Sequence, residues 1–241
     1  MNGNLDDTFV PVKLLPSQLA RVIIWSMAWG EDGNGATLAM LIERSERISD
    51  VTERQRGLID GLEQLFLGKG FRNVTVDELA ANLKCSKRTL YEIASSKQEL
   101  FLLVVERWLE RIRRLGWQGA LQHDDPEKRI IAYLDPGISQ SKLASRKFIE
   151  DMRGFGPARA LLEAHQRERT KVLRDIVEDG QRRGRFRRLH TALVAEVFLA
   201  AVSRINEPNF LESTGISFSD GFAELYELFL NGLFDSPSSA H

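Results

Sequence analysis

Cysteine is nearly absent from this chain of 241 residues, which contains only Cys85. One thiol excludes a disulfide within the chain and any zinc site built from several cysteines. A lone cysteine also fits a reducing compartment. The sequence therefore predicts a cytoplasmic protein.

Long hydrophobic runs are missing as well. The longest apolar segment, VIIWSMAW at 22–29, is far shorter than the ~20 residues that a membrane-spanning helix needs. It lies too deep in the chain, and lacks the basic start, for a secretory signal. We expect no membrane partner.

The sequence also lacks the residue sets that catalysis and metal binding need. No Ser/His/Asp arrangement, carboxylate pair or glycine-rich phosphate loop stands out. His165 and His190 have no further ligand at helical spacing, so we expect them at the surface or on a pocket wall. We predict no enzyme activity, no cofactor and no metal. An enzyme with its active site among the central helices is a competing hypothesis.

Net charge is nearly absent from the whole chain, because 33 basic and 34 acidic side chains leave a net of −1. Its distribution is uneven. Residues 51–115 carry 12 basic and 9 acidic side chains, a net of +3, whereas residues 1–50 carry 4 and 7, a net of −3. Residues 116–241 carry 17 and 18. Any nucleic-acid contact is therefore expected in 51–115.

Helical periodicity dominates the long segments. In residues 54–71 the apolar side chains recur at helical spacing, and Gly70 is the expected C′ residue of that helix. The same pattern recurs in a helix that starts at Lys97, and in 161–184, 191–205 and 218–234. Convincing alternation of period two is absent, so the predicted fold class is all-α.

Residues 75–94, TVDELAANLKCSKRTLYEIA, combine two short helical patterns with a turn at KCS. Thr75 and Glu78 form an expected capping box on the first helix, and Ser86 is the expected cap of the second. The second helix is expected to turn Leu90 and Ile93 inward and to expose Lys87, Arg88, Thr89 and Tyr91. A short exposed helix with basic and hydroxyl groups near its N-terminus suits the major groove of DNA.

The stretches LIDGLEQLFLGKGF and TVDELAANLKCSKRTLYEIASSKQEL resemble the DNA-binding domain of the TetR family of transcriptional regulators, from about Thr52 to Val105. The resemblance implies a three-helix helix-turn-helix domain, linked by a fourth helix to an all-helical ligand-binding and dimerisation domain. The expected divisions are an N-terminal extension at 1–50, the helix-turn-helix domain at 51–97 with its motif at 75–94, a C-terminal domain at 98–235 and a tail at 236–241.

The same resemblance implies roles for single residues. The expected DNA-contacting residues are Thr75, Lys87, Arg88, Thr89, Tyr91 and Lys97. Thr89 would meet a base or phosphate, Tyr91 a phosphate, and Lys97 a phosphate beside a helix N-terminus. Lys87 and Arg88 stand at variable positions that tend to set sequence preference. Arg88 is the expected partner of a guanine, because its fork matches O6 and N7.

Three residues depart from the pattern of the family. Lys84 stands in the turn where glycine is usual, and a left-handed conformation there would cost roughly 1 kcal/mol. Ala94 replaces a usual aromatic residue, and Ser95 a frequent proline. We expect the last two to weaken packing between the third and fourth helices.

For the C-terminal half, the resemblance implies a homodimer on a pseudo-palindromic operator in double-stranded DNA, with the protein at the nucleoid when bound. The segments 191–202 and 222–234 are the expected dimer helices. An unknown small-molecule effector would bind among the central helices and release the DNA. Trp117, Arg153 and His165 are the candidate pocket residues, and activation is the alternative to repression.

Several features allow a second interpretation. Cys85 suits packing better than redox sensing. The arginines 182, 183, 185, 187 and 188 suit a solvated helix end better than a second DNA patch. Residues 1–50 are interpreted as a loosely attached arm, and also fit an early translation start with Met40 as an internal candidate. For the whole chain, the alternative to a regulator is a helical interaction protein that kept the fold but lost DNA binding.

Overall fold

The structure is a computed structural model that describes residues 53–233. Its elements are α3 (Glu53–Lys69), α4 (Val76–Asn82), α5 (Lys87–Ile93), α6 (Lys97–Leu121), α7 (Pro126–Ser141), α8 (Arg146–Gly154), α9 (Gly156–Arg182), α10 (Thr191–Ile205), α11 (Pro208–Thr214) and α12 (Phe218–Leu233). The predicted all-α fold is confirmed over this range. The extension at 1–50 and the tail at 236–241 lie outside the described residues.

Helix α3 ends as its sequence predicts. Leu62 and Phe66 are fully buried on its inner face. Gly70 has φ +75°, and its N–H donates to the Phe66 carbonyl at 2.8 Å. A β-carbon at Gly70 would lie 2.7 Å from a carboxylate oxygen of Asp151, so both conformation and space favour glycine here.

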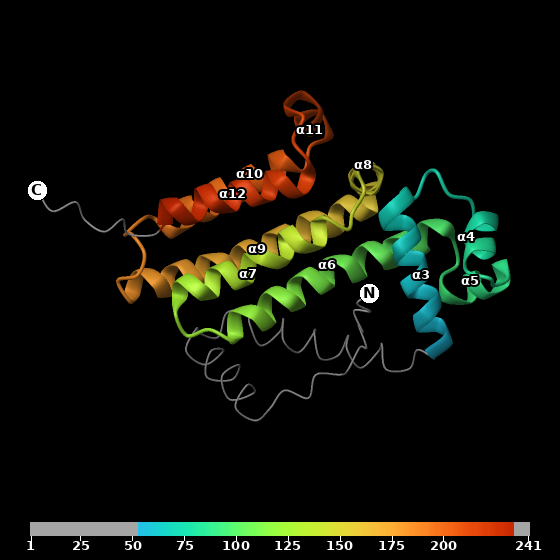
Figure 1. The fold of residues 1–241 in the computed structure, drawn as a ribbon, viewed down its shortest axis with the longest axis horizontal. Coiled ribbons are helices and arrows are strands. Elements are labelled where there is room, and N and C mark those ends of the chain that lie inside the picture. The colour runs from blue at the N-terminus through green and yellow to red at the C-terminus, as the bar shows by residue number, and fades with distance from the viewer. Residues whose placement is uncertain (1–52, 234–241) are drawn as a thin grey trace, which may run out of the picture. The chain divides into compact units, whose positions relative to one another are not determined.

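Helix α6 connects the two halves of the described chain (Figure 1). Its first half buries Leu100, Phe101 and Val104 against α3–α5. Its second half packs closely on α7, where a β-carbon at Gly116 would lie 2.8 Å from the carbonyl oxygen of Tyr133. Glycine therefore permits this close approach of the two helices.

Two hydrophobic clusters form the core. The first joins α3, α4, α5, the first half of α6, α8 and the start of α9. The second joins the end of α6 with α7, α9, α10 and α12. Figure 1 shows α3, α4 and α5 gathered at one end of α6, with α10 and α12 side by side on the far side of α9. Within residues 53–233, no helix is both long and apolar enough to span a membrane.

The sequence pattern does not predict three of these helices, α7, α8 and α11. Helix α7 begins with Pro126 behind the N-cap Asp125 and contains Pro136 in its interior. A proline removes a backbone donor and interrupts the apparent period, which hides such a helix in the sequence. Helix α8 is short, although Phe148, Ile149 and Met152 are almost completely buried.

Candidate DNA-contacting surface and buried cavity

The helix-turn-helix forms with the caps that the sequence predicts. The Thr75 hydroxyl accepts from the Glu78 N–H at 3.2 Å, and the Glu78 carboxylate accepts from the Thr75 N–H at 2.7 Å. These bonds to Thr75 lower the pKa of Glu78. Ser86 caps α5 by accepting from the Thr89 N–H at 3.1 Å. The Thr75 hydroxyl therefore takes part in local capping, and the Thr89 hydroxyl lies 2.9 Å from the Ser86 hydroxyl.

Helix α5 presents a polar face to solvent. Leu90 is fully buried beneath it, whereas Lys87, Arg88 and Tyr91 are exposed and Thr89 is half-buried. Lys87 Nζ lies 2.6 Å from Asp77 Oδ1, and Arg88 Nε lies 3.2 Å from Glu92 Oε1. The hydrogen bond and charge of Asp77 raise the pKa of Lys87. Both cations are thus exposed to solvent, and each is paired with a carboxylate.

Lys97 lies at the first position of α6, behind the N-cap Ser96. Its ammonium donates to the carbonyls of Phe71 at 3.1 Å and Val74 at 2.8 Å, and stands 4.6 Å from the Phe71 ring centroid. An ammonium has three donors. Lys97 therefore binds the loop after α3 with two of its three donors.

The turn between α4 and α5 contains the strained residue that the sequence suggests. Lys84 has φ +51°, a left-handed conformation that carries a steric cost for a residue with a β-carbon. Cys85, which follows it, is half-buried, and burial raises the pKa of its thiol. A raised pKa reduces the reactive thiolate, which favours the packing role of Cys85.

Hydrogen bonds connect α8 and its N-cap residue with the end of α3 and the loop that follows it. The buried carboxylate of Asp151 accepts from the N–H of Phe71 at 2.6 Å and of Arg72 at 2.9 Å. The N–H of Ser145 donates to the Leu67 carbonyl at 2.8 Å. These bonds attach the helix-turn-helix region to a helix that also packs on α9.

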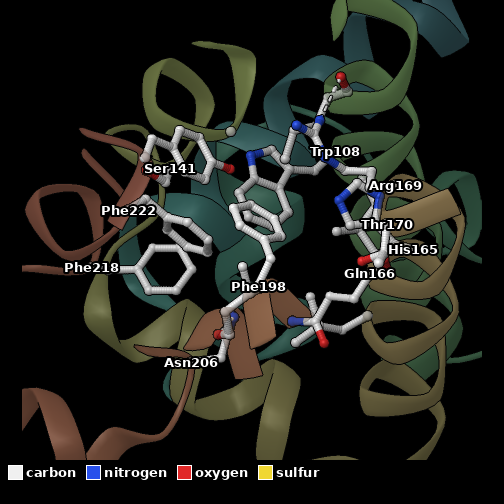
Figure 2. Close-up of a pocket in the computed structure, with 16 residues that line it drawn as sticks. Trp108, Ser141, His165, Gln166, Arg169, Thr170, Phe198, Asn206, Phe218 and Phe222 are labelled. Carbon is white, nitrogen blue, oxygen red and sulfur yellow. Dashed lines mark hydrogen bonds between the residues drawn. The ribbon is translucent and has the colours of Figure 1, made fainter. Parts of the chain in front are cut away.

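A cavity lies among α6, α7, α9, α10 and α12 and has a volume of about 50 Å³ (Figure 2). Helix α9 contributes the polar residues His165, Gln166, Arg169 and Thr170. The apolar wall includes Trp108, Phe198, Phe218, Phe222 and Tyr226. Gln166 Nε2 and Asn206 Oδ1 are buried at this cavity without a hydrogen-bond partner within residues 53–233.

The expected pocket residues lie in different places. His165 lines the cavity, and burial together with Arg169 and Arg113 holds its pKa well below the usual range. Trp117 packs instead on Tyr133, with ring centroids 6.5 Å apart, and Arg153 lies half-buried on α8; neither is among the lining residues.

Most of the cavity residues were missed from the sequence. One signal was available, because 165, 166, 169 and 170 share one face of a helix and form a polar strip beside buried neighbours. Asn206 and the aromatic wall give no such signal. The helices that supply them meet only in the tertiary structure.

The arginines at the end of α9 pair with carboxylates. Arg183 lies 3.1 Å from Asp179, and Arg185 lies 3.0 Å from Glu127. Arg129 also reaches Asp179 at 3.0 Å. The ion pairs of Arg182, Arg183 and Arg185 favour a structural role for these three residues over a second DNA patch. Among residues 53–233, no group of three or more His, Cys, Asp or Glu side chains is placed to hold a metal.

A capped helix-turn-helix followed by a bundle of helices is an architecture typical of DNA-binding regulatory proteins. Residues 58–104 match the model of the family described as "Bacterial regulatory proteins, tetR family". Residues 58–104 therefore form a helix-turn-helix region of the tetR family, and the described residues share the all-helical fold of TetR regulators. Regulators of that family are not enzymes.

Three known proteins resemble this chain in sequence or in fold. The uncharacterized HTH-type transcriptional regulator YvaF of Bacillus subtilis is 21% identical over 175 residues, which cover 70% of this chain and 90% of YvaF. The TetR family regulator PfmR of Thermus thermophilus has a TM-score of 0.53 at 21% identity, covering 74% of this chain and 99% of PfmR. A protein of Saccharomonospora viridis described as a transcriptional regulator, in complex with choline, has a TM-score of 0.62 at 14% identity, covering 75% and 97%.

Proposed function

We propose that this regulator is a sequence-specific repressor that binds a pseudo-palindromic operator as a homodimer and leaves it when a small molecule occupies the cavity. The observation that carries this proposal is a continuous set of aromatic contacts. It runs from the cavity wall to the helix-turn-helix.

The aromatic contacts begin at Trp108, which lines the cavity. Its ring centroid lies 5.5 Å from that of Phe148 on α8, and Phe148 lies 5.7 Å from Phe101. Phe101 stacks at 4.7 Å on Phe71, whose N–H binds Asp151. Close-packed rings cannot be displaced singly. A ligand that moves Trp108 would therefore shift α8 and the end of α3.

Release of the DNA then follows because the effector binds the two arrangements of the protein with different affinity. The effector acts only if it binds one arrangement of α6 and α8 better than the other. DNA favours the opposite arrangement, so each ligand weakens the binding of the other.

The exposed face of α5 supplies the contacts with DNA. Arg88 would exchange Glu92 for a guanine, and Lys87 would exchange Asp77 for DNA. Tyr91, Thr89, Thr75 and Lys97 would hold phosphates or a base edge at its margin. The two carboxylates lie beside the proposed contacts, so they favour release of DNA through charge repulsion.

A homodimer is supported by an apolar surface on the proposed dimer helices α10 and α12. Leu193, Val197 and Leu228 are 62%, 60% and 74% exposed. Leu193 and Val197 are one helical turn apart on α10, and α10 packs beside α12. Two copies of this surface would cover each other in a four-helix contact and present two α5 helices to successive major grooves.

The test is a randomised-site selection followed by gel-shift titration at two salt concentrations. We expect a palindromic site, and an affinity that falls steeply as salt rises. The double variant Lys87→Ala/Arg88→Ala should lose the retarded band. The control Arg159→Ala/Arg174→Ala removes the same charge from α9 and should keep it. Equal, unselective binding by all three proteins would favour the alternative, a helical interaction protein without operator binding.

A further inference from the structure

We propose that the cavity takes a compact organic carboxylate with a ring-sized apolar body and one hydroxyl or N–H donor. This inference rests on the proposed function, because it names the chemical class of the effector. It is carried by two unpaired buried polar atoms, one arginine without a carboxylate partner among the described residues, and an aromatic wall.

Of the two unpaired atoms, one is a hydrogen-bond acceptor and the other is a donor. Asn206 is 1% exposed; its Nδ2 donates to the Val202 carbonyl at 2.6 Å, while Oδ1 has no partner within the described residues. Gln166 is 9% exposed and leaves Nε2, a donor, without a partner there. Unpaired buried polar groups cost free energy, so a structure keeps them where something else satisfies them. A ligand that satisfies both atoms therefore places a hydrogen-bond donor at Asn206 Oδ1 and an acceptor at Gln166 Nε2.

The charge of the lining selects the sign of the ligand. Arg169 is the single formally charged residue of the lining, which contains no Asp or Glu. It donates to the carbonyls of Ile112 at 3.3 Å and Tyr133 at 3.0 Å, and forms no ion pair with a carboxylate of residues 53–233. Its positive charge is thus only partly compensated. An anion gains from that charge, whereas a cation is repelled by it.

A further donor stands beside this charge. Nδ1 of His165 lies 3.3 Å from Nη1 of Arg113, which can only donate. His165 is neutral because burial and the two arginines depress its pKa. With Nδ1 accepting, Nε2 carries the ring hydrogen. His165, Gln166 and Arg169 therefore give one face of α9 a set of donors suited to carboxylate oxygens.

The opposite side of the cavity is aromatic. Figure 2 shows Phe218 and Phe222 on the other side of the view from His165, Gln166 and Arg169, with Trp108 and Phe198 between them. Flat apolar side chains favour a ring. A cavity that holds benzene measures ~150 Å³, whereas this one has about 50 Å³. A ring would therefore have to widen the cavity, and one wall that must move is Trp108.

The test uses isothermal titration of the full chain with named probes. The acids are 4-hydroxybenzoate, 4-hydroxyphenylacetate and 6-hydroxy-2-naphthoate; the matched compounds are their methyl esters, benzoate and choline. We expect at least one hydroxy acid to bind. The methyl ester of that acid, and its analogue without the hydroxyl, should bind about tenfold more weakly. Each lacks one hydrogen bond, and one hydrogen bond changes the dissociation constant about tenfold. Choline should not bind.

Two variants separate binding from folding. Asn206→Leu should weaken the best hydroxy acid about tenfold without lowering the melting temperature, because it removes an unpaired buried acceptor. A purely structural Asn206 would instead lower the melting temperature and leave affinity unchanged. Gln166→Glu places a carboxylate near Arg169, and should abolish acid binding and admit choline.

The inference is overturned if none of the acids binds, or if the esters or choline bind the native chain as tightly as the acids. Operator binding is measured on the same ligand-free preparations. Retained operator binding with the wrong ligand class refutes this inference alone. Loss of selective operator binding refutes the proposed function, while calorimetry still reports the ligand class.

Discussion

The buried carboxylate of Asp151 accepts a 2.6 Å hydrogen bond from the backbone N–H of Phe71, across a separation of 80 residues in the sequence. Asp151 belongs to α8, beside the cavity helices, and Phe71 follows the first helix of the helix-turn-helix region. The bond makes the orientation of that region depend on the position of α8.

Replacing Asp151 by alanine should destabilise the fold by about 1–3 kcal/mol, because the N–H of Phe71 would be left buried and unpaired. Urea unfolding measures the change. Glu150→Ala on the same helix removes a more exposed carboxylate, and should stay within about 0.5 kcal/mol of the native chain. If both variants lose the same stability, the bond to Phe71 is not the cause.

The left-handed Lys84 offers a stabilising change. Lys84→Gly should raise the free energy of unfolding by roughly 0.5–1 kcal/mol, since glycine adopts φ +51° without the steric cost. Lys84→Ala is the matched control, because it removes the same charge but keeps the β-carbon. A gain shared by both variants would point to charge and not to backbone conformation.

If α5 recognises DNA, substitutions at Arg88 and Glu92, which pair with each other, should change the affinity for the operator in opposite directions. Arg88→Ala should cost about 1–3 kcal/mol of operator binding and relax preference at one base pair. Glu92→Gln removes the carboxylate that pairs with Arg88 and should strengthen binding. Both are measured by titration of the selected operator and its single-base variants. Unchanged base preference in Arg88→Ala would refute its assignment to guanine.

The apolar surface of α10 and α12 predicts the oligomeric state. Val197→Glu combined with Leu228→Glu should convert a dimer to a monomer, because it would place charges in the proposed contact. Sedimentation velocity measures the change. Leu143→Glu, at another exposed leucine outside these helices, should remain dimeric. A native chain that is monomeric at all concentrations would contradict the proposed dimer.

Asp175 on α9 predicts a pH dependence. Burial raises its pKa to about 6, above an unfolded value near 3.8. The ionised form therefore destabilises the fold at pH 7, and this penalty disappears as pH falls through 6 toward 4. Asp175→Asn should stabilise the chain at pH 7.5 by about 1 kcal/mol, less than the ~3 kcal/mol of a fully buried group because the carboxyl is half-exposed.

Melting curves of the native chain and Asp175→Asn across pH 4–7.5 provide the check. The advantage of the variant should shrink below pH 6. An advantage that stays constant over this range would show that the substitution changed packing and not titration.

The helix-turn-helix was predictable from local sequence because its determinants are local. The caps Thr75 and Ser86 act within three residues, and Gly70 ends α3 through its own dihedral angle. The salt bridge from Lys87 to Asp77 was not foreseen, since it crosses the turn between two helices.

The cavity depended on contacts that no local pattern encodes. The sequence by itself determined the all-α class, the main helices and the exposed face of α5, because spacing and capping act over a few residues. Only the tertiary structure decided that His165 faces the cavity while Trp117 and Arg153 do not, and that Gln166 and Asn206 leave polar atoms unpaired beside it within the described part of the chain. The physical reason is that burial and charge compensation depend on which helices pack together, and those partners lie far apart along the chain.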